Sequence, residues 1–224
     1  GVRVQRVSVD AGLTCPNVDG TLERGGCVFC NNASFSPSRR LPPKTGQRPS
    51  IATQIDEGIR RLQRRYGDCE HFIAYFQPAT NTYAPVDQLR RLYEQALAHP
   101  NVIGLAIGTR PDCAGNDVLD LLGDIAHRTF LSVEYGMQTM HDRSLDWMNR
   151  GHRHAATVDA ITRSRGRGFE IGAHVILGLP GESRDDMRAT AQELSRLNVD
   201  AVKLHNLYVV HNTPLAEQVN RGEV

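Results

Sequence analysis

Short apolar runs alternate with amphipathic segments along nearly the whole chain. Most of the runs are continuous, as in strands that are buried on both faces of a parallel sheet. They cover residues 4–9, 72–76, 102–107, 130–135, 171–179 and 201–209. Helical spacing of apolar positions predicts helices over residues 51–66, 86–98, 116–126, 144–148, 155–165 and 184–197. The alternation predicts an α/β fold, a partial (β/α)6 TIM-like barrel of parallel strands with outer helices.

The loops after the predicted strands hold most of the chemically versatile residues. They read DAGLTCPN, FQPATNTY, GTRPDC, EYGMQT, GLPGE and LYVVHNTP. In a parallel barrel such loops gather at the carboxyl ends of the strands, where catalysis takes place. The first loop, residues 10–50, has a length that usually indicates a function. We expect residues 1–224 to form a single domain, trimmed at both ends.

Composition narrows the class of protein. Hydrophobic residues make up 40% of the chain and charged residues 23%, as in ordinary globular proteins. No apolar run approaches the roughly 18 residues of a membrane-spanning helix. The opening segment GVRVQRVSVD lacks the apolar stretch of a signal peptide. We therefore expect a cytoplasmic protein with no membrane partner.

Charge is unevenly distributed along the chain. Residues 1–65 carry 11 Lys and Arg against 5 Asp and Glu, whereas the remainder carries 15 against 20. Basic residues gather in a Pro/Ser-rich stretch and on the predicted helix that follows it: Arg39, Arg40, Lys44, Arg48, Arg60, Arg61, Arg64 and Arg65. The pattern favours a partner that carries phosphate groups, although a solvated helix face beside a loop would look the same.

Three of the five cysteines lie close together, at Cys15, Cys27 and Cys30. Without a secretory signal, metal binding is favoured over disulfides. Three interpretations fit the spacing: a zinc site completed by a histidine, structural thiols without metal, or a four-iron cluster with one iron left open. The segment follows the first strand of a parallel barrel, where a catalytic centre would lie, and this favours the cluster.

The run Cys27-Val28-Phe29-Cys30 resembles the motif of the radical SAM superfamily, which also has an aromatic residue before its last cysteine. The usual motif has three residues between its first two cysteines, and this chain has eleven. That longer spacing, between SVDAGLTCPN and GGCVFCN, is similar to the YhcC-type subfamily, which is related to the radical SAM domain of the Elongator catalytic subunit. Further similar stretches are YFQPATNTYAP, IGTRPDC, VEYGMQT, NRGH, GLPGE and VKLHNLYVVHNTPL.

The resemblance implies an enzyme. Cys15, Cys27 and Cys30 would hold a [4Fe–4S] cluster, with residues 10–50 as the cluster-binding loop. S-adenosylmethionine (SAM) on the open iron would be cleaved reductively to a 5′-deoxyadenosyl radical, which abstracts hydrogen from a substrate. A flavodoxin- or ferredoxin-type donor would supply the electron, and a tRNA wobble uridine is one candidate substrate. The alternative from another class is a zinc-stabilised, non-catalytic RNA- or protein-binding module.

The resemblance also implies SAM contacts. They fall at Phe29, Gln77, Asn81, Glu134, Gln138, Arg150, His174, Ile176, Gly178 and Leu207. Phe29 and Ile176 would lie near the adenine, and Gln138 and Arg150 near the ribose and the carboxylate, to which a planar guanidinium is well suited. Structural roles stay open for Phe29 as core filling, for Gln138 as a helix cap and for His174 as a buried histidine.

Arg110, Cys113 and Lys203 are the catalytic candidates. Arg110 can bind a carboxylate or phosphate in bidentate fashion, or can form a salt bridge with Asp112 that stiffens the loop. Cys113 is placed for a covalent or radical partner, or is an inert small residue. Lys203 should point into the barrel, because it alternates with apolar neighbours along the last strand.

Overall fold

One sheet of six parallel strands forms the centre of the computed structural model, which describes residues 2–31, 34, 48–67 and 69–224. The strands are paired in chain order from first to last. They are β1 (Val4–Val9), β2 (His71–Phe76), β3 (Val102–Thr109), β4 (Phe130–Gln138), β5 (Glu170–Leu177) and β6 (Ala201–Asn206). Helical crossovers between adjacent parallel strands produce this order.

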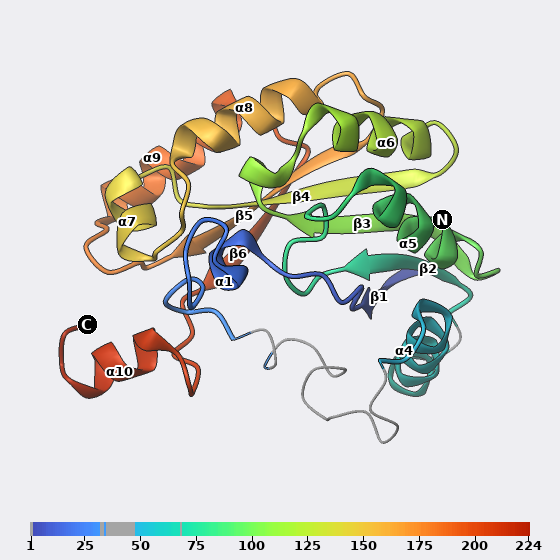
Figure 1. Cartoon of the computed structure of the whole chain (residues 1–224), viewed down its shortest axis with the longest axis horizontal. Helices are drawn as coiled ribbons and strands as arrows, with labels where there is room; N and C mark the ends of the chain where they lie inside the picture. The colour runs from blue at the N-terminus through green and yellow to red at the C-terminus, as the bar shows by residue number, and fades with distance from the viewer. Residues whose placement is uncertain (1, 32–33, 35–47, 68) are drawn as a thin grey trace.

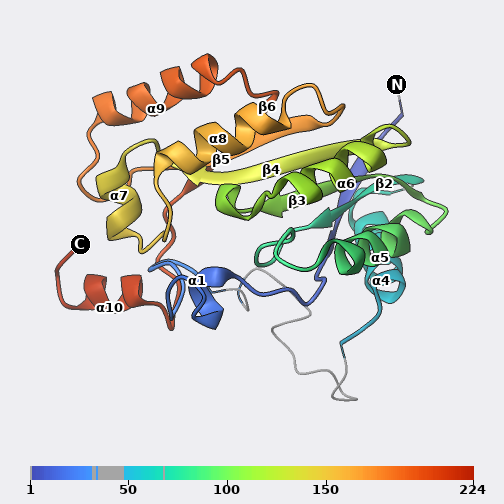
Figure 2. The same ribbon diagram turned by 45° about the horizontal axis from the view of Figure 1, so that its top comes forward.

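The sheet curls into a half-barrel with helices along its outer face (Figures 1 and 2). No pairing between β1 and β6 closes it among the described residues. The longer helices are α4 (Ile51–Tyr66), α5 (Val86–Leu97), α6 (Asn116–Ala126), α8 (His154–Ser164) and α9 (Arg184–Arg196). The shorter ones are α1 (Pro16–Asp19), α7 (Asp142–Trp147), α10 (Pro214–Asn220) and the 3-10 turn η1 (Pro111–Cys113). The predicted partial barrel of parallel strands with outer helices is confirmed.

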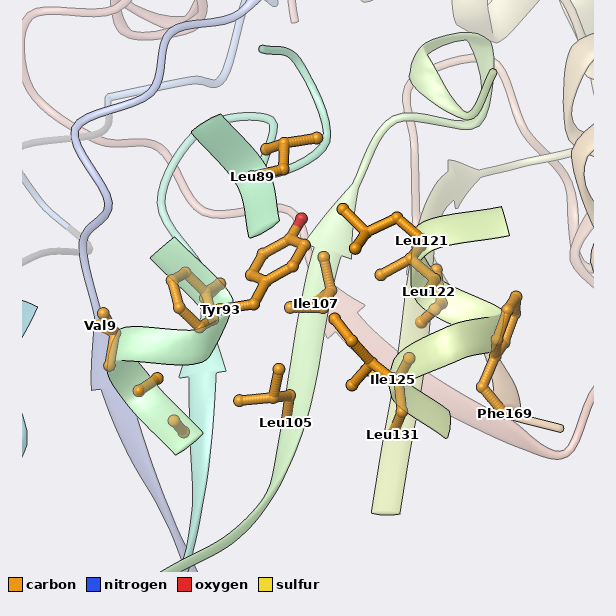
Figure 3. Close-up of a cluster of buried hydrophobic side chains, with 14 of the residues drawn as sticks. Val9, Leu89, Tyr93, Leu105, Ile107, Leu121, Leu122, Ile125, Leu131 and Phe169 are labelled. Carbon is orange, nitrogen blue, oxygen red and sulfur yellow. The ribbon is translucent and has the colours of Figure 1, made fainter. Parts of the chain in front are cut away.

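The main core fills the space between the sheet and the helices that cover it (Figure 3). Leu105 and Ile107 lie two residues apart on β3 and so face the same side of the sheet. Both are fully buried in the same cluster as Tyr93 of α5 and Leu122 of α6. Burial of each such side chain contributes roughly 1.5–3 kcal/mol. This packing holds the strands, and so positions the loops at their carboxyl ends.

Two predicted strands are longer than the observed ones, and two short α-helices and the turn η1 were not predicted. β5 ends at Leu177 because Gly178 follows with a φ of 77°, outside the extended region. β6 ends at Asn206 instead of continuing to residue 209. Helices α1 and α10 were not predicted, although Thr213-Pro214 is a recognisable start signal for α10. Within the described chain, no helix is long and apolar enough to cross a membrane.

Helix α4 approaches β1 closely at Gly58. A Cβ added at Gly58 would lie 2.1 Å from the Cγ2 atom of Val7, which is too close for two carbon atoms. Gly123 of α6 is also buried and helical, but a Cβ there would meet nothing nearer than the Arg167 carbonyl oxygen, at 3.6 Å. The two glycines therefore separate the effect of helix propensity from that of steric overlap.

We expect opposite results from alanine at these two positions. Gly123→Ala should raise the free energy of unfolding by about 0.5–1 kcal/mol, because alanine loses less backbone entropy than glycine. Gly58→Ala should lower it by about 1–3 kcal/mol, because the overlap with Val7 outweighs that gain. Urea denaturation of both variants beside the wild type measures the difference, and equal shifts would contradict the close approach.

Candidate active site

A cavity of about 260 Å³ opens at the carboxyl ends of the strands, beside the loop that follows β1. Most of the predicted site residues line it: Cys15, Cys27, Phe29, Cys30, Gln77, Arg110, Glu134, Gln138, Arg150, His174, Ile176, Lys203 and Leu207. Every strand contributes at least one of them, directly or through the loop after it. This is the end of a parallel barrel at which catalytic residues gather.

The three predicted cluster cysteines border the cavity from one loop. Cys15 immediately precedes the short helix α1. Cys27 and Cys30 stand at the two ends of a tight turn, in which the Cys30 amide donates to the Cys27 carbonyl at 2.9 Å. Gly25 and Gly26 precede this turn with φ values of 87° and 81°, which residues with side chains rarely adopt. Two consecutive glycines thus permit the chain reversal that presents Cys27 and Cys30 together.

The segment between α7 and α8 holds the cysteine turn in place. The Val28 amide donates to the Met148 carbonyl at 3.0 Å, and the Asn149 side chain donates to the Gly26 carbonyl at 3.1 Å. Asn17 is completely buried, and its side-chain amide donates to the Asn149 carbonyl at 2.5 Å. These bonds join two segments more than a hundred residues apart in sequence, so the loop is docked against the barrel rim.

An apolar wall forms one side of the cavity. Phe29, Ile176 and Leu207 line it and pack together with the buried side chain of Val28. Helix α10 lies beside α1 in both views (Figures 1 and 2), and its Leu215 amide donates to the Val28 carbonyl at 2.9 Å. The structure therefore brings Phe29 and Ile176, which were predicted near the adenine, next to the cysteine turn together with Leu207.

Three side chains direct N–H groups toward the cysteine sulfurs. Arg150 Nη1 lies 3.5 Å from Cys27 Sγ, and Asn17 Nδ2 lies 3.8 Å from the same sulfur. Arg110 Nη1 lies 4.0 Å from Cys15 Sγ. Both arginines are buried, so they can donate charge-assisted hydrogen bonds to sulfur ligands away from bulk water.

The donor set fits an iron–sulfur cluster better than a zinc ion. Among the described residues, no three His, Cys, Asp or Glu side chains converge closely enough to hold a single metal ion. A four-iron cluster is larger than one ion, so its cysteine ligands stand further apart around a shared cavity. Three thiols leave one iron free for another ligand, which the adjoining cavity can admit.

A bulge at the end of β4 shapes the rim of the cavity. The pairing of β4 with β5 shifts register between Gly136 and Gln138, and Gln138 has a φ of 69°. Bulges and left-handed non-glycine residues are frequent at functional sites. A Cβ added at Gly136 would lie 2.6 Å from Arg150 Nη2, which donates to the Gly136 carbonyl at 2.8 Å. Gln138 thus lines the cavity and is not the N-cap of α7, a position held by His141.

Below the rim, five cavity-lining side chains from four strands form a hydrogen-bonded group that we call the floor network: Tyr75, Glu134, His174, Lys203 and His205. Glu134 is its centre, because Oε2 accepts from the Tyr75 hydroxyl and from His174 Nε2, both at 2.7 Å. Oε1 is paired with Arg6 of β1.

The outer members of the floor network are Lys203 and His205 of β6. Lys203 Nζ donates to the Tyr75 hydroxyl oxygen at 3.2 Å, and His205 Nε2 lies 3.3 Å from His174 Nδ1. Glu134 therefore receives hydrogen bonds from the network, while Lys203 and His205 stand at its ends.

Burial and hydrogen bonding set the charges of the floor network. Burial opposes the charge of Glu134, but hydrogen bonds from His174 and Tyr75 outweigh it and lower its pKa to about 2. Burial and the neighbouring His174 lower the pKa of His205 to about 4. At neutral pH Glu134 is therefore ionised and His205 is neutral.

The lowered pKa of Glu134 makes stability depend on pH. The ordinary pKa of a Glu side chain is 4.5, and that of Glu134 is about 2. The hydrogen bonds to the ionised carboxylate therefore stabilise the fold at pH values above 4.5. This contribution, on the order of 2 kcal/mol, is lost as the pH falls from 4.5 to about 2. We expect Glu134→Gln to lose less stability than the wild type between pH 7 and pH 3, as measured by urea denaturation.

The control for this experiment is Glu217→Gln, at an exposed position of α10. It should keep the acid sensitivity of the wild type. If Glu134→Gln and the wild type lost the same free energy of unfolding on acidification, the hydrogen-bonded carboxylate would not be the source of the dependence.

Three predicted site residues do not line the cavity: Asn81, Cys113 and Gly178. Asn81 is completely buried, and its side chain donates to three backbone carbonyls near the ends of β2 and β3. Cys113 ends the turn η1, and burial and the nearby Asp112 raise its thiol pKa to about 12. Gly178 turns the chain at the end of β5. In the structure these residues support the loops.

The predicted salt bridge between Arg110 and Asp112 is present. Arg110 Nε donates to Asp112 Oδ1 at 2.9 Å, and Nη2 donates to Oδ2 at 2.7 Å. The bridge uses one edge of the guanidinium and leaves Nη1 directed toward Cys15. The same side chain therefore stiffens the loop after β3 and faces the cavity.

Sequence reasoning did not identify Tyr75 or Asn17 as site residues. Tyr75 lies in the apolar run FIAYF, where it resembles core filling. Its neighbours Ala74 and Phe76 belong to the main core, so strand alternation was the available signal that Tyr75 faces the other way. Asn17 lies two residues after Cys15, and nothing in the sequence distinguishes it from a polar loop residue.

The sequence profile of the Radical SAM superfamily matches residues 24–194. The chain belongs to this superfamily, and it is accordingly a radical SAM enzyme that uses a [4Fe–4S] cluster and SAM. It is 39% identical over 227 residues to the uncharacterized protein YtqA of Bacillus subtilis, covering 100% of this chain and 68% of YtqA. It is 37% identical over 225 residues to protein YhcC of Escherichia coli K12, covering 100% of this chain and 70% of YhcC.

Solved structures share the fold. The archaeal Methanocaldococcus infernus Elp3 with an N-terminal deletion superposes with a TM-score of 0.68 at 19% identity, covering 99% of this chain and 50% of that chain. Coproporphyrinogen III oxidase (HemN) from Escherichia coli superposes with a TM-score of 0.59 at 18% identity, covering 97% of this chain and 46% of that chain. The predicted membership of the superfamily and the relationship to YhcC are confirmed. The chain is therefore an enzyme, and the alternative of a zinc-stabilised binding module is not retained.

Proposed function

We propose that Cys15, Cys27 and Cys30 hold the [4Fe–4S] cluster, that SAM binds in the adjoining cavity, and that a hydrogen atom is taken from a substrate deeper in the same cavity. The observation that carries this proposal is that the three thiols border one cavity at the carboxyl ends of the strands. Together the bound cofactors supply a 5′-deoxyadenosyl radical. The residues of this chain bind, orient and shield the reactants.

Arg150 and Gln138 would bind the polar part of SAM at the rim. Arg150 Nε is buried without a hydrogen-bond partner among the described residues, which leaves a donor for an incoming carboxylate. A planar guanidinium suits this role better than an ammonium does. Gln138 is held toward the cavity by the bulge at the end of β4, and Gln77 lines the same cavity from the loop after β2.

The apolar wall would receive the adenine and exclude water. Phe29, Ile176 and Leu207 supply a surface that needs no hydrogen-bond partner. Excluding water also protects a reactive carbon radical from side reactions. The cluster requires a low-potential electron, so the proposal includes a cytoplasmic donor of the flavodoxin or ferredoxin type.

A tRNA wobble uridine is our candidate substrate. A partial relative, the tRNA uridine(34) acetyltransferase of Methanocaldococcus jannaschii, is 29% identical over 130 residues, which is 56% of this chain and 23% of that protein. Part of the predicted basic segment, Arg39, Arg40 and Lys44, lies outside the described residues. Four exposed arginines of α4 remain as a candidate contact for RNA phosphates: Arg60, Arg61, Arg64 and Arg65.

Anaerobic purification followed by an iron and sulfide assay tests the proposed chemistry. Protein with its cluster, given SAM and dithionite, should form 5′-deoxyadenosine, detected by liquid chromatography. A colourless protein that holds one zinc and forms no 5′-deoxyadenosine would contradict it. For the substrate, replacing the four α4 arginines by glutamine should weaken tRNA binding and reduce its salt dependence, and unchanged binding would count against that contact.

A further inference from the structure

Two basic side chains lie beside the single carboxylate of the floor network. Glu134 supplies one negative charge, and Arg6 is paired directly with it. Lys203 adds a second positive charge, and the carboxylates of the described residues make no ion pair with it. Arg6 and Lys203 together therefore exceed Glu134 by one positive charge.

Lys203 is only partly satisfied by its protein contacts. Its Nζ lies 4.9 Å from the centroid of the Tyr75 ring and donates one hydrogen bond to that hydroxyl. An ammonium carries three N–H donors, so two remain beyond its hydrogen bond to the described residues, for water or for a ligand. Burial lowers the pKa of Lys203, which is the expected effect of partial desolvation on an ammonium. An anion in the cavity would restore the lost stabilisation.

Glu134 attracts the Lys203 ammonium through space but makes no ion pair with it. Its two oxygens already accept hydrogen bonds from Tyr75 and His174 and pair with Arg6. All of these bonds point inward to the carboxylate, so the network presents the Lys203 ammonium to the cavity. Lys203 and His205 lie two residues apart on β6 and so face the same side of the strand.

The floor network is also too deep to serve the methionine end of SAM. Lys203 lies three residues before the end of β6 at Asn206. Each residue of a parallel strand adds about 3.3 Å, which puts Lys203 roughly 10 Å below the strand end. Cys27 and Arg150 lie in loops, beyond the strands. A ligand bound to the open iron must hold its chelating groups at the rim, and the floor faces the other end of the cavity.

We propose that Lys203 binds a carboxylate group of the substrate. This inference rests on the proposed function, because it assigns the deep end of the cavity to the molecule that loses hydrogen. One carboxylate carries one negative charge, which equals the excess of Arg6 and Lys203 over Glu134. A phosphate monoester carries about 1.5 to 2 negative charges and would exceed it. The carboxylate can belong to a free acid or to an acidic group on a modified RNA base.

Acetate and acetamide are the probes, because they have the same shape and differ in charge. The protein with its cluster is titrated anaerobically with each compound at constant ionic strength, and the rise of the unfolding midpoint yields an apparent Kd. Lys203→Met removes the ammonium and keeps an apolar stem against Tyr75. Arg188→Met is the matched control, because it removes a cation from an exposed site on α9.

We expect acetate to bind the wild type and Arg188→Met equally, with acetamide binding at least tenfold more weakly. Lys203→Met should weaken acetate binding at least tenfold, and Lys203→Arg should retain most of it. Should Lys203→Met not fold, Lys203→Gln replaces it, with an expected loss of tenfold or more. Equal effects of acetate and acetamide on the wild type, or unchanged acetate binding in the folded variant, would overturn the carboxylate site.

The same preparation separates this inference from the proposed function. Failure of the wild type to form 5′-deoxyadenosine would count against the radical chemistry. Formation of 5′-deoxyadenosine without any preference for acetate would overturn the carboxylate site alone.

Competition identifies the source of the carboxylate. Displacement of acetate by cellular tRNA, but not by an unmodified transcript, assigns it to a modified base, and displacement by neither assigns it to a free acid. Equal displacement by both RNAs would mean that phosphates compete, and would overturn selectivity for a carboxylate.

Discussion

Cys27→Ala is expected to lose the bound iron and sulfide and to reduce 5′-deoxyadenosine formation by more than about 100-fold. Cys27 borders the cavity at the end of the cysteine turn and receives N–H groups from Arg150 and Asn17. Two cysteines cannot replace the three that a cluster with one open iron requires. Iron and sulfide content and product formation, measured on the same anaerobic preparation, check the result.

Cys69→Ala is the matched control. Cys69 is equally buried, but it lies in the main core, where its thiol donates to the Arg3 carbonyl at 3.3 Å. Its loss should cost about 1 kcal/mol of stability and leave the iron content and activity unchanged. Retention of iron in Cys27→Ala, or an equal loss in both variants, would contradict the assignment of the cluster to the cysteine turn.

Arg150→Met is expected to make the reduction potential of the cluster more negative by about 60 mV, a tenfold change for a one-electron couple. In the proposed site, reduction of the cluster would add negative charge beside Cys27, and the buried guanidinium 3.5 Å from that sulfur would stabilise the reduced form. Removing the charge and the hydrogen bond therefore favours the oxidised form. A redox titration without SAM, followed by electron paramagnetic resonance, measures the shift independently of turnover.

Arg153→Met and Arg150→Lys make this prediction specific. Arg153 is exposed and pairs with Asp142 and Asp146, so its loss should leave the potential unchanged. Arg150→Lys keeps the positive charge, but an ammonium group lacks the planar guanidinium that contacts both Cys27 and the Gly136 carbonyl. We therefore expect a reduction potential between those of the wild type and Arg150→Met. A wild-type potential in Arg150→Met would show that the contact with Cys27 does not affect the cluster.

The local pattern of the sequence was sufficient to predict the strands and the cysteine loop. Largely continuous apolar runs mark β2 to β5, because strands buried on both faces select apolar residues, whereas β1 and β6 alternate polar and apolar residues. Cys27 and Cys30 are close in sequence, so their proximity in space needed no knowledge of the fold. The chemistry of the thiols then indicated a metal centre.

Contacts between distant segments could not be read from the sequence. Arg6 and Glu134 are 128 residues apart, and their pairing depends on how far the sheet curls. The bulge between Gly136 and Gln138 likewise depends on the register of β4 against β5. Asn81 and Cys113 have the residue types of a functional site, but the direction of their side chains became visible only in the structure.

The gap between β1 and β6 has a mechanical consequence. In a closed barrel, strand number and stagger fix the radius, but among the described residues the sheet ends at β1 and β6 without closing. Some side chains make contacts across the interior of the half-barrel, such as Arg6 with Glu134 and Lys203 with Tyr75. These contacts therefore help to set the curvature of the sheet. A ligand that drew Lys203 away from Tyr75 would weaken the contact between β6 and β2. The two edge strands could then move apart, and the cavity would widen around the ligand.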